Sequence, residues 1–569
     1  MNGLDQLFAA RPLQALSMSP TEVLLIDLAT SERHVLTPEV VGAYAACDTF
    51  DTFEAHRHAL LERMPELRDR AQAVVPVLQN LATRGLMQSA RQLLDSATRA
   101  HAPPDLAPLT LLLDPRDTRS PTALALSAAK RFAGTIGRVR LICEAADDAS
   151  TAWHKGLSDQ GLQVEICDAS EREAWLASLA ESAEDRGWLH LLAGPSLGAD
   201  WHARQTNYGL LRAAGRRVAL LDVDQLGLPL TTPGALNGLD PSAAAVREAW
   251  FDLDQTGTPD GGGWDTALSV CGMGLSDVLG QSEFALTSDA VQGLSRTRLA
   301  QMASPGQIKS VIFGSVGALD APHNRWLYSI GKASRERLLA SDYNRARRGQ
   351  GILHGIAAPR LLNGLSFAPN LVLVDESCGF DGPLAGSAHL WRGALSQLLD
   401  PAGRNLHLSR NLPRSDANGV DRVSAGRAAF RPDLNRLLAD WIMAELPRCQ
   451  AETAPDRADW WSTQMLDLSR APKSLLQERL SAFVSQSQAQ LIGALQYHLE
   501  TAGRVLTEWQ EDVVRIVESQ GQALLATGLP ALEGYDAEPA ARFSRDLQQM
   551  AALTQGWSRW LASATARNQ

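Results

Sequence analysis

The sequence predicts an α/β fold, with a mostly parallel sheet between a small N-terminal domain and an α-helical C-terminal region. Three observations predict it. The first hundred residues carry the signals of a short strand and several helices. Short apolar runs then alternate with helical stretches. Beyond about residue 430 the pattern is amphipathic and helical. We therefore expect domains at 1–102, 105–430 and 431–569.

The composition excludes several classes of protein. At 569 residues the chain is too long for one core, and its 45% hydrophobic and 21% charged residues are ordinary for a globular protein. A net charge of −11 disfavours nucleic acid as a partner, because phosphates would be repelled. The six cysteines form no CxxC pair, which argues against a zinc site or a disulfide framework and fits a reducing compartment.

The chain carries no export or membrane signal that we recognise. It has no run of 18 apolar residues, and its first residues, MNGLDQLFAARPLQAL, lack a basic stretch followed by a long apolar one. We expect a cytoplasmic protein without a transmembrane segment.

The N-terminal domain begins with a strand at 22–28. Thr37 and Pro38 then provide an N-cap and a first helical residue, and an apolar stripe predicts a helix over 69–84. These elements and the closing pattern LxxLxxRGLM at 78–87 resemble the winged-helix domains that recognise leader peptides in ribosomal peptide maturation. A helical docking domain without a peptide role is the alternative.

The middle of the chain alternates between strand and helix patterns. We expect helices between the strands, repeated β-α-β units and hence a parallel sheet whose ligands lie beyond the carboxyl ends of the strands. The expected strands lie at 109–113, 139–143, 163–167, 188–192, 218–221, 308–313 and 371–374.

The sharpest motif follows the apolar strand 218–221. A helix ends near Gly215, and Asp222 and Asp224 come directly after the strand. Two carboxylates there can hold Mg²⁺ or Mn²⁺, which grips a diphosphate and neutralises the charge that develops as a sugar leaves it. A second copy at Asp252 and Asp254 follows no apolar strand, and we interpret it as a solvated loop.

This segment resembles the central motif of A-type (GT-A) nucleotide-sugar glycosyltransferases, especially the family-2-like enzymes. Their motif is a helix, a glycine and an apolar strand that ends in Asp-x-Asp. The resemblance covers about 105–410 and implies a Rossmann-like, mostly parallel sheet. It implies metal-dependent transfer of a sugar from a nucleotide-sugar, with a UDP-sugar as the expected donor, to a peptide, protein or saccharide acceptor.

The resemblance also assigns residues. Asp222 and Asp224 would hold Mn²⁺ or Mg²⁺, with His407 where some of these enzymes place a third metal ligand. The nucleotide would be bound by acids after the first two strands and by the helix before the motif. These residues are Asp114, Asp117, Asp147, Asp148 and Asn207. For Asp114, Asp147 and Asp148 the alternative is a helix N-cap or turn, and for His407 a structural role.

The later acidic motif of the family resembles the segment Gly379-Phe380-Asp381. There an Asp accepts the proton of the acceptor hydroxyl, and a single displacement inverts the anomeric carbon. Phe380 departs from the family, which usually has Glu before this Asp. Asp375 and Glu376 therefore stay candidates for the base, and a turn at a strand end is the alternative for all three.

Two rival functions remain open. A nucleotidyltransferase also needs paired acids and a metal, although we find no glycine-rich basic loop near the first strand. The second rival function is that of a non-catalytic scaffold of the same fold, with the C-terminal helices as its docking surface. The same helices are the candidate surface for a homo-oligomer. No Gly-x-Ser-x-Gly elbow, dinucleotide fingerprint or phosphate-binding loop occurs in the sequence.

Overall fold

A computed structural model gives the structure of the chain. The residues it describes are 3–28, 30–97, 109–114, 136–143, 147–196, 200–222, 229–241, 248–251, 263–304, 306–316, 325–328, 330–347, 352–362, 371–374, 379–382, 384, 388–413, 432–501, 503, 505–525, 532 and 538–568.

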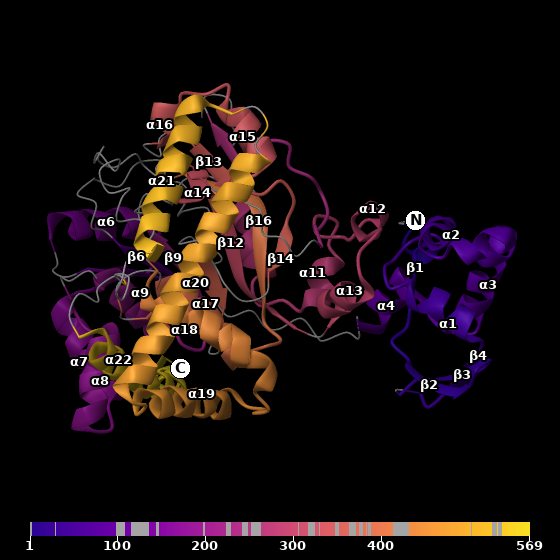
Figure 1. Cartoon of the computed structure of the whole chain (residues 1–569). Coiled ribbons are helices and arrows are strands. Elements are labelled where there is room, and N and C mark those ends of the chain that lie inside the picture. The colour runs from indigo at the N-terminus through magenta and orange to yellow at the C-terminus, as the bar shows by residue number, and fades with distance from the viewer. Residues whose placement is uncertain are drawn as a thin grey trace.

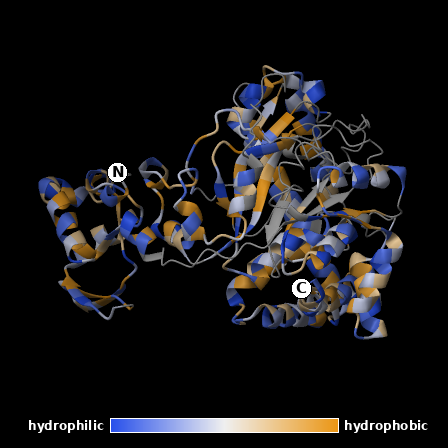
Figure 2. Cartoon of the chain, turned by 180° about the vertical axis from the view of Figure 1, so that it is seen from behind, coloured by the Kyte–Doolittle hydropathy of each residue, from blue (hydrophilic) through white to orange (hydrophobic). Residues whose placement is uncertain are grey.

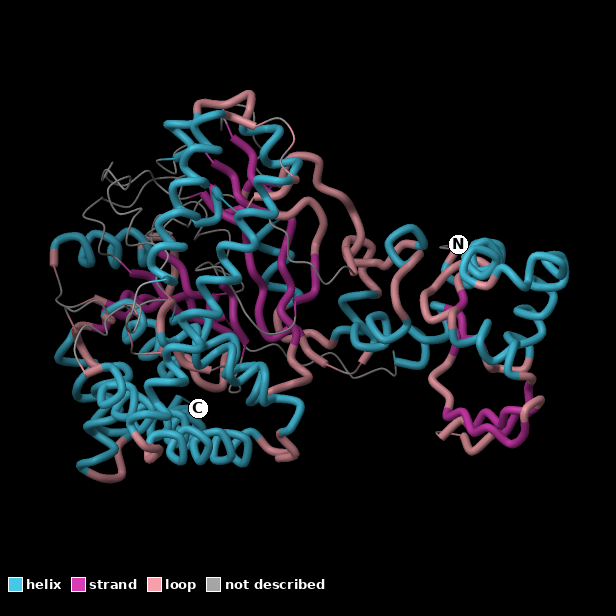
Figure 3. The backbone as a smooth tube through the Cα atoms, viewed as in Figure 1, coloured by secondary structure: helices cyan, strands magenta, loops and turns pink. Residues whose placement is uncertain are grey.

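The N-terminal unit combines two small antiparallel sheets with helices (Figure 1). The strands are β1 (Phe8–Ala10) paired with β5 (Met87–Ser89), and β2 (Gln14–Ser19), β3 (Glu22–Ile26) and β4 (Arg33–Leu36) in a second sheet. The helices are η1 (Leu4–Gln6), α1 (Pro38–Ala45), α2 (Phe53–Arg63), η2 (Pro65–Arg70), α3 (Ala71–Thr83) and α4 (Ala90–Ala97). The expected strand at 22–28 and the helices that begin at Pro38 and end before Arg84 are confirmed. The three-stranded sheet lies to one side of the helices (Figure 3).

The N-terminal unit packs directly on short helices of the middle segment. These are α10 (Gly263–Val270), α11 (Leu275–Leu279), α12 (Ser288–Val291) and α13 (Arg296–Ala303). One hydrophobic cluster contains Leu4 and Phe50 from the unit and Leu299 from α13. The Phe50 amide also donates to the Leu294 carbonyl at 2.8 Å. The unit is therefore held by a shared core as well as by the chain connection.

The main sheet has eleven described strands. Its parallel half has the spatial order β8-β7-β6-β9, and its other half continues with β15, β12, β16 and β10, with β13, β11 and β14 at the side. The bounds are β6 (Leu109–Asp114), β7 (Ile136–Ile142), β8 (Val164–Cys167), β9 (Arg217–Asp222), β10 (Leu230–Thr231), β11 (Glu248–Phe251), β12 (Ile308–Val316), β13 (Ile352–Gly355), β14 (Arg360–Leu362), β15 (Leu371–Val374) and β16 (Arg404–Pro413).

The prediction of a mostly parallel, Rossmann-like sheet is wrong for the sheet as a whole. The sheet is mixed and curls into half a barrel. The strand β15 runs antiparallel to both of its neighbours, β9 and β12. Among the described strands of the second half, β12 and β16 are the one parallel pair. A four-residue apolar run predicts a strand but not its direction, because direction depends on the connection that leads into it.

The predicted strand at 188–192 is also wrong. These residues lie in helix α8 (Ala183–Ala193), whose N-cap Ser182 accepts a hydrogen bond from the Asp185 amide at 3.0 Å. A short apolar run does not by itself distinguish a buried strand from a buried helix turn. The N-cap at Ser182, twelve residues before the glycine at 194, decides for the helix.

Helices cover both faces of the sheet, as the period of two along each strand requires. Val218 of β9 and Ile312 of β12 belong to one hydrophobic cluster, and their neighbours Ala219 and Val311 belong to another. On the first face lie α7 (Ala169–Leu179), α8, α9 (Trp201–Arg212) and α17 (Ala388–Leu399), and on the second α6 (Asp148–Ser158). In Figure 2 the coloured strands between these layers carry orange segments, which mark hydrophobic residues.

The expected helical C-terminal region is present and packs on the first face. Its helices are α18 (Leu434–Glu445), η6 (Leu446–Arg448), α19 (Ala454–Ser469), α20 (Lys473–Glu500), α21 (Thr507–Leu525) and α22 (Pro539–Asn568). Trp461, Trp557 and Trp560 lie in the same cluster as Trp391 of α17 and Val218 of β9. The C-terminal helices and the sheet therefore share one core.

The helices α20 and α21 pair with each other and lie beside three short helices, α14 (Arg325–Tyr328), α15 (Lys332–Leu338) and α16 (Tyr343–Arg347) (Figure 1). The Trp509 indole donates to the Leu327 carbonyl at 3.0 Å, and the Tyr343 hydroxyl donates to Asp512 at 2.7 Å. Among the helices that the structure describes, we find none with the length and apolar character needed to cross a membrane.

Candidate site at the carboxyl ends of the parallel strands

The parallel half of the sheet reverses its strand order between β6 and β9. The chain passes from β6 outward to β7 and β8 and then returns to β9 on the other side of β6. Open α/β sheets bind ligands beyond the carboxyl ends of their strands at such a reversal. Asp114, the last residue of β6, stands in register with Asp222, the last residue of β9. Two of the predicted acids therefore end adjacent strands at the reversal point.

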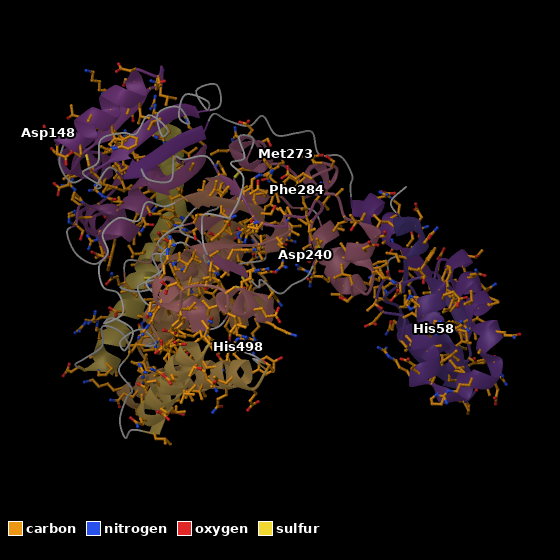
Figure 4. All side chains as sticks on the ribbon, turned by 90° about the horizontal axis from the view of Figure 1, so that it is seen from above. His58, Asp148, Asp240, Met273, Phe284 and His498 are labelled. Carbon is orange, nitrogen blue, oxygen red and sulfur yellow. The ribbon has the colours of Figure 1, made fainter. Side chains whose placement is uncertain are left out.

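Asp147 follows β7 and caps helix α6. Its Oδ1 accepts a hydrogen bond from the Ser150 amide at 2.7 Å, and its own amide donates to the Ser150 hydroxyl at 2.9 Å. These bonds from Ser150 lower the pKa of the Asp147 carboxyl. Asp148 is exposed in the first turn of the same helix (Figure 4). The N-cap interpretation of Asp147 is thus confirmed, and Asp148 is accessible to a ligand.

A further carboxylate at this edge was not predicted. Asp168 follows β8 and caps helix α7, where it accepts from the Glu171 amide at 2.9 Å. Burial, and then the negative charges of Asp147 and Asp168, raise the pKa of the Cys143 thiol to about 11. An Asp between an apolar strand and a helical pattern could have been found in the sequence. Each of the four parallel strands is now followed by, or ends in, an aspartate, which makes this edge suited to a cation.

Asn207 lies inside the protein, in the middle of α9. Its side chain is completely buried, donates to the carbonyls of Leu192 at 3.0 Å and Asp381 at 2.8 Å, and accepts from the Asp381 amide at 2.7 Å. Asp381 is 4% exposed, and its carboxylate forms an ion pair with Arg392 at 2.9 Å. The structure therefore brings two predicted site residues together, but in the core between helices.

The strand before the other two candidate bases ends far from Asp222. Val374, the last residue of β15, is in register with Arg217, the first residue of β9. Because β9 spans six residues, its first residue, beside Val374, lies about 16 Å from Asp222 at its other end. Asp375 and Glu376 come next in the sequence and lie outside the described residues.

His407 is buried in the middle of β16. The register runs from Leu220 of β9 through Leu371 and Ile312 to His407. Three strand spacings of about 4.8 Å place its Cα roughly 14 Å from that of Leu220. Metal–ligand bonds are only about 2 Å long, so sharing one ion with Asp222 at the strand end is not favoured. The geometry favours the structural interpretation of His407.

Several predicted residues fall outside what the structure describes. These are Asp117, Asp224, Asp375 and Glu376, together with the side chains of Asp114 and Asp222. Within the described part of the chain, no group of three or more His, Cys, Asp or Glu side chains could hold a metal ion. The donor set at the strand ends still fits a hard divalent cation, because carboxylate oxygens are the ligands that Mg²⁺ and Mn²⁺ prefer.

Comparison with known proteins adds no family: neither a protein-family model nor a curated protein matches this sequence.

Proposed function

We propose that this chain is a metal-dependent glycosyltransferase that moves a sugar from a nucleotide-sugar to an acceptor. The observation that carries the proposal is the register of Asp114 with Asp222 at the point where the parallel strands reverse their order. A nucleotide diphosphate placed there would meet Asp222 through a bound cation, with Asp114 on the adjacent strand.

The chemistry assigns a task to each part of this edge. Asp222 and Asp224 would hold Mn²⁺ or Mg²⁺, which when bound supplies positive charge for the leaving diphosphate. The nucleoside would lie toward the ends of β6 and β7, near Asp114, Asp117 and Asp148. The acceptor oxygen attacks the anomeric carbon as the bond to the diphosphate breaks, and its proton passes to a carboxylate base, with inversion.

A peptide or protein acceptor is supported by the N-terminal unit. Leu16 and Met18 on β2 and Val35 on β4 are 45%, 59% and 47% exposed, so the small sheet presents apolar side chains to solvent. Exposed apolar patches commonly mark surfaces that bind another protein or peptide. A saccharide acceptor is the alternative. The cysteines that the structure describes are free thiols, which supports a cytoplasmic location.

A thermal-shift screen tests the proposal. The full chain is melted with UDP-, GDP- and TDP-sugars, each with and without Mn²⁺. We expect one nucleotide to raise the melting temperature only when Mn²⁺ is present, because a ligand that binds the folded state stabilises it. Asp222→Asn and Asp224→Asn should abolish that shift. Asp252→Asn and Asp254→Asn, which change the second copy of the same pattern, are the matched controls and should retain it.

A non-catalytic scaffold is the second candidate, and one observation favours it. Asp381, the residue that most resembles the family's base, is held in a buried pair with Arg392. A scaffold would fold normally and show no metal-dependent nucleotide shift, or would bind the donor without releasing sugar. Mass spectrometry of acceptor peptides incubated with the bound donor separates these outcomes from transfer.

A further inference from the structure

The segment 379–382 is contacted by helices from different parts of the chain. The Gly379 amide donates to the Ser396 hydroxyl of α17 at 2.8 Å. The Phe380 ring lies against Trp391 and Trp557, with centroids 5.9 and 5.3 Å apart. A Cβ atom on Gly382 would collide with the Asn435 side chain of α18. Gly379 and Phe380 are thus held by neighbouring helices, and position 382 has no room for a side chain.

Asp381 is bound through its backbone as well as its side chain. The Asn207 side chain accepts a hydrogen bond from the Asp381 amide and donates one to the Asp381 carbonyl. The Arg392 guanidinium donates to the Asp381 carboxylate at 2.9 Å. Asp381 and Arg392 are 4% and 5% exposed. A general base must come within hydrogen-bond reach of an acceptor hydroxyl, directly or through one water. A buried carboxylate already held by a guanidinium is poorly placed for that task.

The same contacts join two segments that matter for the proposed site. Asn207 lies on α9, the helix that leads through Gly215 into β9 and so to Asp222. Arg392 lies on α17, the helix that follows the segment after β15. Asn207 also donates to the Leu192 carbonyl at the end of α8. These bonds therefore tie residues 379–382 to the helix that leads into β9.

The geometry points to a positioning clamp made by Asn207, Asp381 and Arg392. In this assignment, which rests on the proposed function, Asp381 is a positioning residue that holds residues 379–382 against α9 and α17. It does not accept the proton in the transfer step. The proton acceptor is another carboxylate.

A double-mutant cycle separates the clamp from a catalytic base. Arg392→Gln leaves a buried carboxylate without its partner, and we expect kcat for transfer to fall roughly 10- to 100-fold through misplacement. Adding Asp381→Asn replaces the pair with two neutral amides and should restore most of the loss. Asp381→Asn alone should keep the acidic limb of the kcat–pH profile. If Asp381 were the base, its removal would cost about 10²- to 10⁴-fold, the limb would vanish and the double variant would recover nothing.

Hydrogen exchange tests the clamp even if the chain transfers no sugar. Arg392→Gln should speed amide exchange in peptides that contain 379–396, and the double variant should slow it again. The exposed pair Arg436–Asp440 on α18 supplies the control, since Arg436→Gln with Asp440→Asn should leave this exchange unchanged. Unchanged exchange in Arg392→Gln would overturn the clamp. A missing nucleotide shift in the unaltered chain would instead count against the glycosyltransferase alone.

Discussion

Aspartates at the strand ends stabilise the fold by capping helices, in addition to any role in binding a ligand. Asp147 is the clearest case, since it completes a capping box with Ser150. Asp147→Ala should lower the free energy of unfolding by about 1 kcal/mol, while Asp147→Asn, which can also cap, should change it little. Because the cap bonds lower the pKa of this carboxyl, its stabilisation is present above the ordinary value of 3.8 and is lost as the pH falls below it. Urea denaturation of the two variants measures the difference, and equal losses would contradict the cap.

Gly314 occupies a position where the structure leaves no room for a side chain. It lies on β12, where an added Cβ would overlap the Asn411 side chain and approach the His354 carbonyl at 2.7 Å. Since Asn411 is completely buried and hydrogen-bonded to Thr232, it cannot move aside without breaking that bond. We expect Gly314→Ala to cost several kcal/mol, roughly 2 to 4, by overpacking.

Melting curves of the Gly314→Ala variant check this expectation. Gly187→Ala is a suitable control, because nothing lies within 4 Å of a Cβ at that position. It should be neutral or slightly stabilising in helix α8. Similar melting temperatures for the two variants would show that the strand can absorb the extra methyl group.

At the scale of elements, the pairing of α20 with α15 depends on a neutral histidine. The Arg335 guanidinium donates to His498 Nδ1 at 3.0 Å. Burial, and then the charge of Arg335, lower the pKa of His498 below its ordinary value of 6.5. The unfolded chain therefore binds this proton more readily, so stability falls as the pH drops through 6.5 toward the lowered value.

Replacing His498 tests that pH dependence. His498→Gln should reduce the loss of stability between pH 7.5 and 5.5 by a few tenths of a kcal/mol, because solvent screens a half-exposed group. The exposed His58 on α2, at the other end of the molecule, is the control (Figure 4). Urea midpoints at the two pH values measure the effect. An identical pH dependence in His498→Gln and the unaltered chain would contradict it.

The sequence predicts the elements of the parallel half well and those of the other half less well. The apolar runs that become β6 to β9 are each bounded by helix signals, such as the turn at Gly215, where φ is 77°. Nothing local indicates that β15 enters the sheet antiparallel. The helix that contains 188–192 does have local signals, its N-cap Ser182 and the glycine at 194. The contact between Asn207 and Asp381 joins residues 174 positions apart, and no spacing rule reports such a pair. The aspartates at strand ends are local features, and they were the part of the site that could be predicted.

At the scale of the whole molecule, the helical C-terminal region and the sheet form one cooperative structure. Trp557 on α22 is 1% exposed and contacts Phe380 in the segment before α17. Arg216, the residue before β9, donates to the Asn568 carbonyl at 2.8 Å. We expect Trp557→Ala to cost about 3 to 5 kcal/mol and to lower the transition of the entire core. Leu525→Ala, at an 85% exposed position, should have no effect. Calorimetry that resolved a separate early transition for the C-terminal helices would contradict a shared core.

The central claim is that a divalent cation and a nucleotide diphosphate bind where β6 and β9 end. Crystals grown with MnCl₂ and the nucleotide found by the thermal-shift screen test it most directly, since manganese can be located by its anomalous scattering. We predict a peak bounded by the carboxylates of Asp222 and Asp224, with the diphosphate on its open side. A peak elsewhere, for example beside Asp252 and Asp254, or a diphosphate bound away from the ends of β6 and β9, would contradict the account.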